Sequence, residues 1–143
     1  MPYPEPLIIP MREDLTKFGV AETRTAADVD SVIASSGTVL MVTNSVCGCA
    51  AGKARPAVGM ALQNSVRPDV AATVFAGADV EAVARLRDQH LPGVAPSSPS
   101  MALFRDGKVV WALHRSDIES RQAPEIAALL TQAFGKFCAQ TIS

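Results

Sequence analysis

The sequence predicts an α/β domain whose mostly parallel sheet is finished by an antiparallel hairpin and carries helices on both faces. Strand-like and helix-like patterns alternate between residues 20 and 90, as expected of parallel strands joined by crossover helices. Residues 38–43 are β-branched and apolar with little alternation, which is typical of a strand covered on both faces. Asp106-Gly107 separates two later apolar runs and is a strong signal for a hairpin turn.

Each element has a local signal of its own. Gly19 is expected to stop the first helix, Thr25 to cap the second and Ser116 to cap the last. Pro56 is expected to kink its helix or divide it into two shorter ones. The expected elements, in order, are helix 11–18, edge strand 20–23, helix 26–33, central strand 38–43, a helix from the cysteines to about 65, strand 69–76, helix 79–90, strands 101–105 and 108–114, and a helix from 116 that is broken or restarted near Pro124.

Apolar residues at helical spacing predict which faces of the later helices are buried. The expected inward-facing residues are Val58, Ala61 and Leu62, then Val80, Val83, Ala84 and Leu86, and finally Ile126, Leu129, Leu130, Ala133 and Phe134. Residues 1–19 form an N-terminal extension, in which four prolines at positions 2, 4, 6 and 10 predict an extended run along the surface.

The 143-residue chain is 48% hydrophobic and has a formal net charge of −1. Its length fits one domain, residues 1–143, with a real core, and its charge argues against nucleic acid as a partner. No apolar run reaches the roughly eighteen residues that span a bilayer, and residues 1–6 lack the basic start of a signal peptide. A cytoplasmic protein without a membrane partner is therefore expected. The apolar N-terminal arm is the one feature that favours a homo-oligomer.

Two cysteines one residue apart, Cys47-Gly48-Cys49, follow the central strand where a helix can begin. Unpaired backbone N–H groups and the helix dipole favour a thiolate there, so the pKa of Cys47 should fall. A disulfide across Cys-x-Cys closes a small, strained ring, and strained disulfides are easily reduced. Gly48 suits so tight a ring because it has no Cβ. The pair is therefore expected to exchange disulfides.

Two other interpretations of the pair stay open at this point. Cys47 and Cys49 could be half of a metal site completed by Cys138, His90 or His114, although structural zinc sites usually space paired cysteines by two to four residues. The pair could also be inert and buried, since free cysteine often behaves as a small apolar residue. Three cysteines in a reducing compartment are more often catalytic or metal-bound than structural.

The order of elements, with cysteines after the second strand and a proline before the penultimate one, resembles the thioredoxin fold over residues 20–134. The resemblance implies that Pro99 is a cis proline beside the cysteines. It also implies that the backbone of Ser98 receives the substrate chain.

A closer resemblance rests on Asn44-Ser45-Val46-Cys47-Gly48-Cys49-Ala50-Ala51-Gly52, on residues 54–57 and on the Pro-rich start with residues 12–15. These segments are similar to the bacilliredoxin family, whose members are implicated in removing bacillithiol from mixed disulfides and in disulfide isomerisation. The departure from ordinary thioredoxins is that Cys-Gly-Cys replaces Cys-x-x-Cys.

The family resemblance implies a role for each cysteine of the pair. Cys47 attacks the substrate disulfide, and Cys49 resolves the mixed disulfide that forms. Lys53 and Arg55 lie near the helix start, where they could attract the carboxylates of bacillithiol, although solvation alone also explains both cations. Cys138 is expected to be structural or accessory, with a second resolving role as the alternative.

We therefore expect a thiol–disulfide oxidoreductase with no bound cofactor or metal and with bacillithiol as co-substrate. Its expected partners are mixed-disulfide proteins and a low-molecular-weight thiol. The alternatives are a disulfide isomerase or reductant for other substrates, and a metal-binding or redox-sensing module without turnover.

Overall fold

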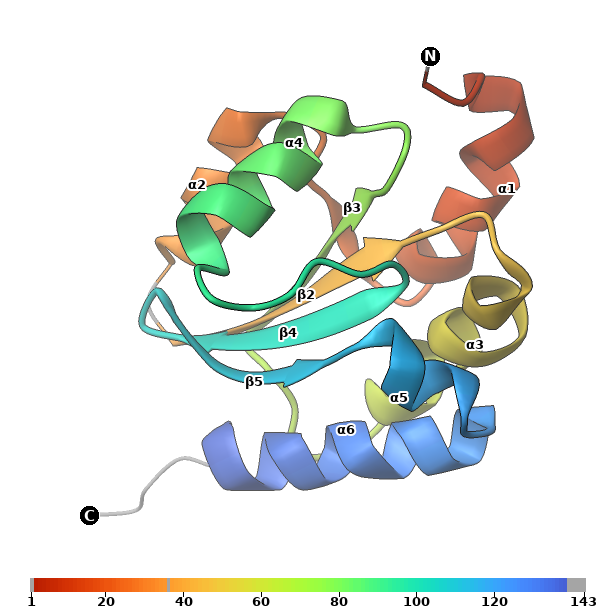
Figure 1. Cartoon of the computed structure of the whole chain (residues 1–143). Coiled ribbons are helices and arrows are strands. Elements are labelled where there is room, and N and C mark those ends of the chain that lie inside the picture. Colours follow the sequence, from red (N-terminus) through yellow and green to blue (C-terminus); the bar gives the residue numbers. More distant parts are fainter. Residues whose placement is uncertain (1, 36, 139–143) are drawn as a thin grey trace.

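The computed structural model describes residues 2–35 and 37–138, and Figure 1 shows their arrangement. A five-stranded mixed sheet lies between two layers of helices. The elements are α1 (Glu5–Thr16), β1 (Ala21–Glu22), α2 (Ala26–Ile33), β2 (Thr38–Asn44), the π-helical turn η1 (Ala50–Ala54), α3 (Arg55–Ala61), β3 (Val70–Phe75), α4 (Val80–Arg85), the π-helical turn η2 (Leu86–His90), β4 (Ser100–Arg105), β5 (Lys108–Leu113), α5 (Arg115–Glu119) and α6 (Ala123–Phe137).

The strands lie in the order β1-β3-β2-β4-β5. Strands β1, β3 and β2 are parallel, whereas β4 is antiparallel to both β2 and β5. The parallel part with a C-terminal antiparallel hairpin is therefore confirmed. Asp106 and Gly107 both have positive φ, at 50° and 84°, as the tight turn of such a hairpin requires.

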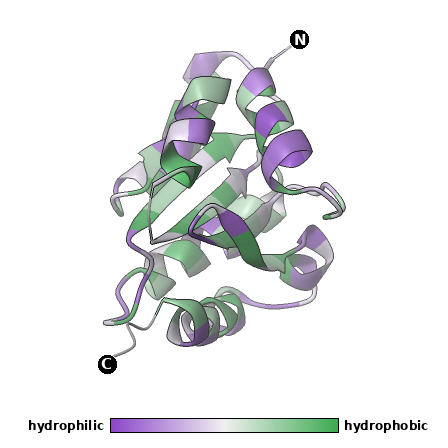
Figure 2. Ribbon diagram, turned by 90° about the vertical axis from the view of Figure 1, so that its left-hand side faces the viewer, coloured by the Kyte–Doolittle hydropathy of each residue, from purple (hydrophilic) through white to green (hydrophobic). Residues whose placement is uncertain are grey.

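The two faces of the sheet bury separate cores. Helices α2 and α4 pack together over one face, and α3 and α6 pack together over the other, where Leu15 of α1 joins them (Figure 1). All seven residues of β2 are buried, which confirms it as the central strand. Figure 2 shows strands of mostly hydrophobic colour between helices that mix hydrophobic and hydrophilic residues. The sheet's middle thus gains apolar burial from both sides.

The expectation of an extended proline-rich start is wrong, because residues 5–16 form helix α1. Pro6 lies in the first turn, where its missing N–H costs no hydrogen bond. Pro10 lies inside the helix, where its missing N–H costs one backbone hydrogen bond, and tertiary anchoring offsets this loss. The buried residues of α1 are Ile8, Arg12 and Leu15, whose spacing places them on one face.

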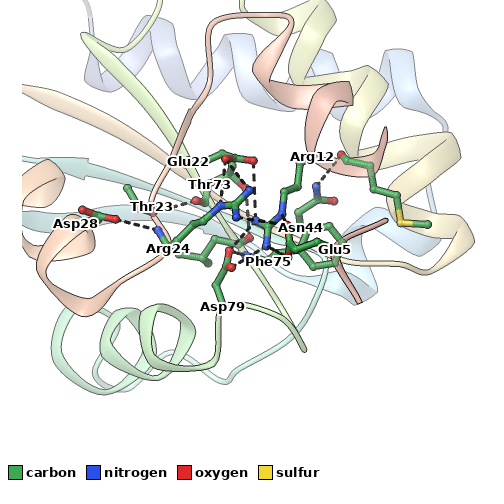
Figure 3. Close-up of polar contacts among 12 residues, drawn as sticks. Glu5, Arg12, Glu22, Thr23, Arg24, Asp28, Asn44, Thr73, Phe75 and Asp79 are labelled. Atoms are coloured by element: carbon green, nitrogen blue, oxygen red, sulfur yellow. Dashed lines mark hydrogen bonds and ion pairs between the residues drawn. The ribbon is translucent and has the colours of Figure 1, made fainter. Parts of the chain in front are cut away.

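Arg12 holds α1 against the end of β3 through a buried ion pair (Figure 3). Its two terminal nitrogens donate to the two carboxylate oxygens of Asp79 at 2.9 and 2.8 Å, and Nε donates to Glu5 at 3.1 Å. The guanidinium also lies 5.3 Å from the centroid of the Phe75 ring. The hydrogen bond with Asp79 raises the pKa of Arg12 above its usual value, against the opposing effect of burial. Arg12 therefore stays charged and fixes the helix.

The predicted inward orientation of Val80 and Ala84 is also wrong. Val80 and Ala84 face solvent, whereas Ala82, Val83 and Leu86 are buried. The reason is Asp79, which turns inward to accept hydrogen bonds from Arg12 and from the Phe75 N–H and so sets the rotation of α4.

Ser116 is not a cap, because α5 begins at Arg115 after the N-cap residue His114. Asp117 accepts a hydrogen bond from the His114 N–H at 3.1 Å. The expected break near Pro124 is confirmed, since α6 begins anew at Ala123. The Thr25 cap of α2 is also confirmed, with the Asp28 N–H donating to its hydroxyl at 3.1 Å.

Candidate thiol–disulfide site

The loop that carries the cysteines is anchored where β2 ends. The Asn44 side chain donates to the carbonyl of Met11 in α1 at 3.1 Å and accepts from the Ser45 N–H at 2.8 Å. Both Asn44 and Ser45 are buried. Because buried polar groups keep their partners, these bonds fix the chain three residues before Cys47 and tie it to α1.

Cys47 stands directly before the helix that follows β2. Its carbonyl accepts hydrogen bonds from the N–H groups of Ala50 at 3.1 Å and Ala51 at 3.2 Å. The helix starts with the wide turn η1, closed by the Arg55 N–H on the Ala50 carbonyl. Pro56 then lies in the first turn of α3, where a residue without an N–H is tolerated. The helix is not split into two separate ones at Pro56, because the π-helical turn passes directly into α3 with helical backbone at Ala54 and Arg55.

The electrostatic setting of Cys47 favours its thiolate. Burial alone would raise the pKa of the half-buried thiol, but hydrogen bonds from the Ala50 N–H, the Ser45 hydroxyl and both the thiol and N–H of Cys49 outweigh burial and lower the pKa. Ser45 Oγ also accepts from the Cys47 N–H at 3.3 Å. A thiolate is the nucleophilic form of cysteine, so this setting suits Cys47 to attack a disulfide.

The loop of Ser98 and Pro99 lies at the same end of the sheet. Thr43 pairs with Ser100 across β2 and β4, so Pro99 leaves the sheet beside the segment that leads to Cys47. The Ser98–Pro99 peptide bond is cis, and Pro99 is buried. The fold thus brings Ser98 and Pro99, predicted from the resemblance to receive substrate, close to the cysteine loop.

The two cations predicted to attract substrate occupy different settings. Lys53 Nζ donates to the carbonyl of Glu119 in α5 at 2.6 Å. The Arg55 side chain is only 4% exposed and pairs with Asp14 of α1 at 2.7 Å, while its second terminal nitrogen donates to the Ser45 carbonyl at 3.4 Å. Lys53 remains near the site surface, whereas Arg55 points into the protein and braces the cysteine loop against α1.

Arg115 is a site residue that the sequence analysis missed. Its backbone N–H donates to Ser97 Oγ at 3.2 Å, its Nη1 donates to the Ser98 carbonyl at 3.1 Å, and its Nε donates to the carboxylate of Glu119. The hydrogen bond with Glu119, followed by the negative charge of Cys47, raises the pKa of Arg115. A signal existed in the hairpin register: Met101 pairs with Leu113, so Arg115 falls opposite Pro99.

Cys138 lies far from the pair. It is half-buried beside Thr38 and Asp69, and burial raises the pKa of its thiol. Thr38 begins β2, whereas Cys47 follows the end of that strand. Cys138 is therefore remote from any disulfide formed at Cys47.

In the described part of the chain, no third side chain joins Cys47 and Cys49 as a metal site would require. Within residues 2–35 and 37–138, no three His, Cys, Asp or Glu side chains gather as a metal site would need. His90 contacts Asp30 at 2.8 Å, and His114 precedes α5. In the same part of the chain, no helix has both the length and the apolar character to cross a membrane.

Comparison with known proteins settles the family. A family model described as disulphide isomerase matches residues 3–138. A protein named Bacilliredoxin from Koribacter versatilis is 50% identical over 140 residues, which cover 97% of this chain and 96% of the relative. The chain belongs to the bacilliredoxin family. Another Bacilliredoxin, from Bacillus licheniformis, is 46% identical over 138 residues and covers 95% of each chain.

Solved structures support the thioredoxin fold of this family member. The oxidised thioredoxin of Plasmodium falciparum superposes with a TM-score of 0.59 at 18% identity, over 84% of this chain and 99% of that one. Thioredoxin O2 of Arabidopsis thaliana gives a TM-score of 0.58 at 13% identity, over 82% and 96%. Family and fold together support a thiol–disulfide oxidoreductase.

Proposed function

We propose that this chain reduces mixed disulfides between proteins and bacillithiol, with Cys47 as the nucleophile and Cys49 as the resolving thiol. The observation that carries the proposal is the hydrogen-bonded setting of Cys47, which lowers its pKa while leaving the sulfur partly exposed. Relatives named Bacilliredoxin, 46–50% identical over nearly the whole chain, support bacillithiol as the small thiol.

The reaction consists of two exchanges. The Cys47 thiolate attacks the bacillithiol sulfur of the mixed disulfide, the S–S bond breaks, and the protein thiol leaves as a thiolate. The Cys49 thiolate then attacks Cys47 Sγ, displaces bacillithiol as a thiolate and leaves a Cys47–Cys49 disulfide. A thiol or dithiol reductant must return two electrons to that disulfide before the next turnover.

The surrounding residues have distinct parts in this proposal. Ser98 and Pro99 line the substrate side, and Lys53 adds positive charge near the helix start. Arg55 instead positions the loop, because its guanidinium is buried against Asp14 and the Ser45 carbonyl. The reaction needs no bound cofactor, and a reducing cytoplasm is the compartment in which such a pair would cycle.

A test uses a model protein carrying one bacillithiol mixed disulfide. The Cys47→Ser variant should release no bacillithiol above the uncatalysed rate, and Cys49→Ser should accumulate a Cys47–bacillithiol adduct visible by mass spectrometry. Cys138→Ser serves as the matched control and should react like wild type. Full release by Cys47→Ser would remove Cys47 from the proposed role. A disulfide between Cys47 and the substrate protein in Cys49→Ser would show that Cys47 attacks the protein sulfur instead of the bacillithiol sulfur.

A second candidate is protein disulfide isomerisation, favoured by the family model that matches residues 3–138 under the description disulphide isomerase. The same Cys47 thiolate would attack a protein disulfide, and a substrate thiol would displace it again. Comparing the rate on scrambled ribonuclease with the rate on a bacillithiol mixed disulfide separates the two. Faster recovery of ribonuclease activity would favour isomerisation.

Exposed apolar side chains on α1 and just before it could form a contact between two copies of the chain. Tyr3, Leu7 and Ile9 are 39–51% exposed, so a homo-oligomer through this arm stays a prediction. Sedimentation of wild type and Leu7→Glu would test it, because a dimer through this face should dissociate in the variant.

A further inference from the structure

The cations beside Cys47 differ in whether a ligand can reach them. The Arg55 side chain is 4% exposed and forms an ion pair with Asp14, whereas the Arg115 side chain is 44% exposed. Arg115 directs Nη1 to the Ser98 carbonyl and Nε to Glu119. Within residues 2–35 and 37–138, its Nη2 has no hydrogen-bond partner. One donor edge of Arg115 is thus available at the surface of the site.

Two cations lie in this corner of the site. Arg115 pairs with the Glu119 carboxylate, whereas Lys53 donates only to the neutral backbone carbonyl of Glu119, so the two cations face one carboxylate between them. The guanidinium is close enough to Cys47 for the charge of the thiolate to act on it. An acidic group on a molecule whose sulfur approaches Cys47 would therefore find the exposed donor edge of Arg115 within reach.

The hydrogen bond to Ser98 adds a second consequence. A polypeptide lying along the Ser98–Pro99 loop would form backbone hydrogen bonds, as peptides do when they add to an extended segment. Nη1 of Arg115 already occupies the Ser98 carbonyl at 3.1 Å. An incoming backbone N–H would have to reach the second lone pair of this carbonyl beside the Arg115 side chain, whereas a small thiol does not need this carbonyl. The contact therefore crowds a peptide backbone more than a small ligand.

We propose that Arg115 is the specificity-determining residue of this site and selects mixed disulfides whose attacked sulfur belongs to a small, carboxylate-bearing thiol. This inference rests on the proposed function and refines its substrate class. A guanidinium suits the task because its planar donor edge matches a carboxylate. Glu119 competes for that edge and limits the preference.

The experiment compares two substrates that differ in one group. A fixed peptide thiol is joined by a disulfide either to 3-mercaptopropionate, which carries a carboxylate, or to 2-mercaptoethanol, which carries a neutral hydroxyl. Second-order rates with Cys47 are measured by following peptide thiol release under single-turnover conditions. Each rate is corrected by the rate of the same small-thiol disulfide with free cysteine, which removes intrinsic differences in reactivity.

The corrected rate ratio, carboxylate over hydroxyl, is the readout. Wild type should show a ratio of about three, the size expected of one exposed ion pair. Arg115→Gln should bring it to about one, and Glu119→Gln should raise it above wild type. Arg121→Gln removes an equal charge from the linker after α5 and should keep the wild-type ratio. Any change in Cys47 ionisation alters both rates equally, so the ratio isolates recognition.

Three results would overturn the inference. The first is a wild-type ratio of one, and the second is a loss of preference in Arg121→Gln equal to that in Arg115→Gln. The third is an unchanged ratio in Arg115→Gln with both rates lowered, which would mean that Arg115 only positions the loop. If wild type reacts with neither substrate, the proposed function itself fails. Reaction with both at equal corrected rates leaves the proposed function intact and rejects the role of Arg115.

Discussion

At the scale of single residues, Ser45 is the side chain whose effect on Cys47 is most direct. Its hydroxyl hydrogen-bonds to the Cys47 sulfur and lowers the pKa of that thiol. Ser45→Ala should raise the pKa, so the thiolate fraction at pH 7 and the alkylation rate should both fall. Ser45→Thr keeps the hydroxyl and is the matched control. An alkylation profile of Ser45→Ala that overlays wild type would show that this hydrogen bond does not act on Cys47.

Whether a site residue could be predicted from the sequence depended on how far along the chain its contact partners lie. Cys47 and Cys49 could be singled out as candidates because their spacing and the helix start are local features. Arg115 was missed because its closeness to Ser98 follows from the pairing of β4 with β5. Arg55 was read as an exposed cation because nothing local predicts Asp14, 41 positions away, as its partner.

At the scale of elements, α1 depends on one buried ion pair. Arg12→Met would leave Asp79 charged and unpaired at 6% exposure, and breaking such a pair costs about 3–5 kcal/mol of the free energy of unfolding. Arg24→Gln, which removes exposed pairs to Glu5 and Glu22, should cost less than about 1 kcal/mol. Urea unfolding measures both. Similar losses in the two variants would mean that the Arg12–Asp79 pair does not anchor the helix.

The elements that could be predicted from the sequence are those with a strong local pattern. Strands β2 and β3 were predicted because a short continuous apolar run is typical of a strand covered on both faces. The hairpin was predicted because Asp-Gly favours a tight turn between strands. The second half of helix α1 overlaps the predicted helix 11–18. Its first half was missed because the prolines argue locally against a helix, and the ion pair that offsets them joins residues 67 positions apart. Tertiary contacts here override local preference.

At the scale of the whole molecule, the third cysteine lies apart from the chemistry. Cys138 packs near the start of β2, and Cys47 follows the end of the same strand. Cys138→Ser should therefore leave the single-turnover rate within about twofold of wild type, as expected for a substitution remote from the reacting sulfurs. Quenched-flow release of the peptide thiol measures this. A tenfold slower variant would place Cys138 in the exchange after all.

The order of strands and helices was predictable as a whole because alternating patterns and short connections leave few topologies. The two faces and their cores followed from that order. The location of Cys138 did not, since it requires knowing how α6 lies across the sheet. The candidate site therefore combines two kinds of residues. The cysteines are neighbours in one loop, whereas Ser98, Pro99 and Arg115 are brought to them by strand pairing.

The stabilisation of the Cys47 thiolate is measured most directly by the rate of Cys47 alkylation by iodoacetamide against pH in a Cys49→Ser/Cys138→Ser protein, which keeps a hydroxyl donor at position 49. Because only the thiolate reacts, the rate rises with pH and levels off above the pKa. Because hydrogen bonds to the Cys47 sulfur stabilise its thiolate, the midpoint should lie below the value of about 8.5 found for free cysteine. A midpoint at or above that of an unfolded peptide with the same sequence would contradict it.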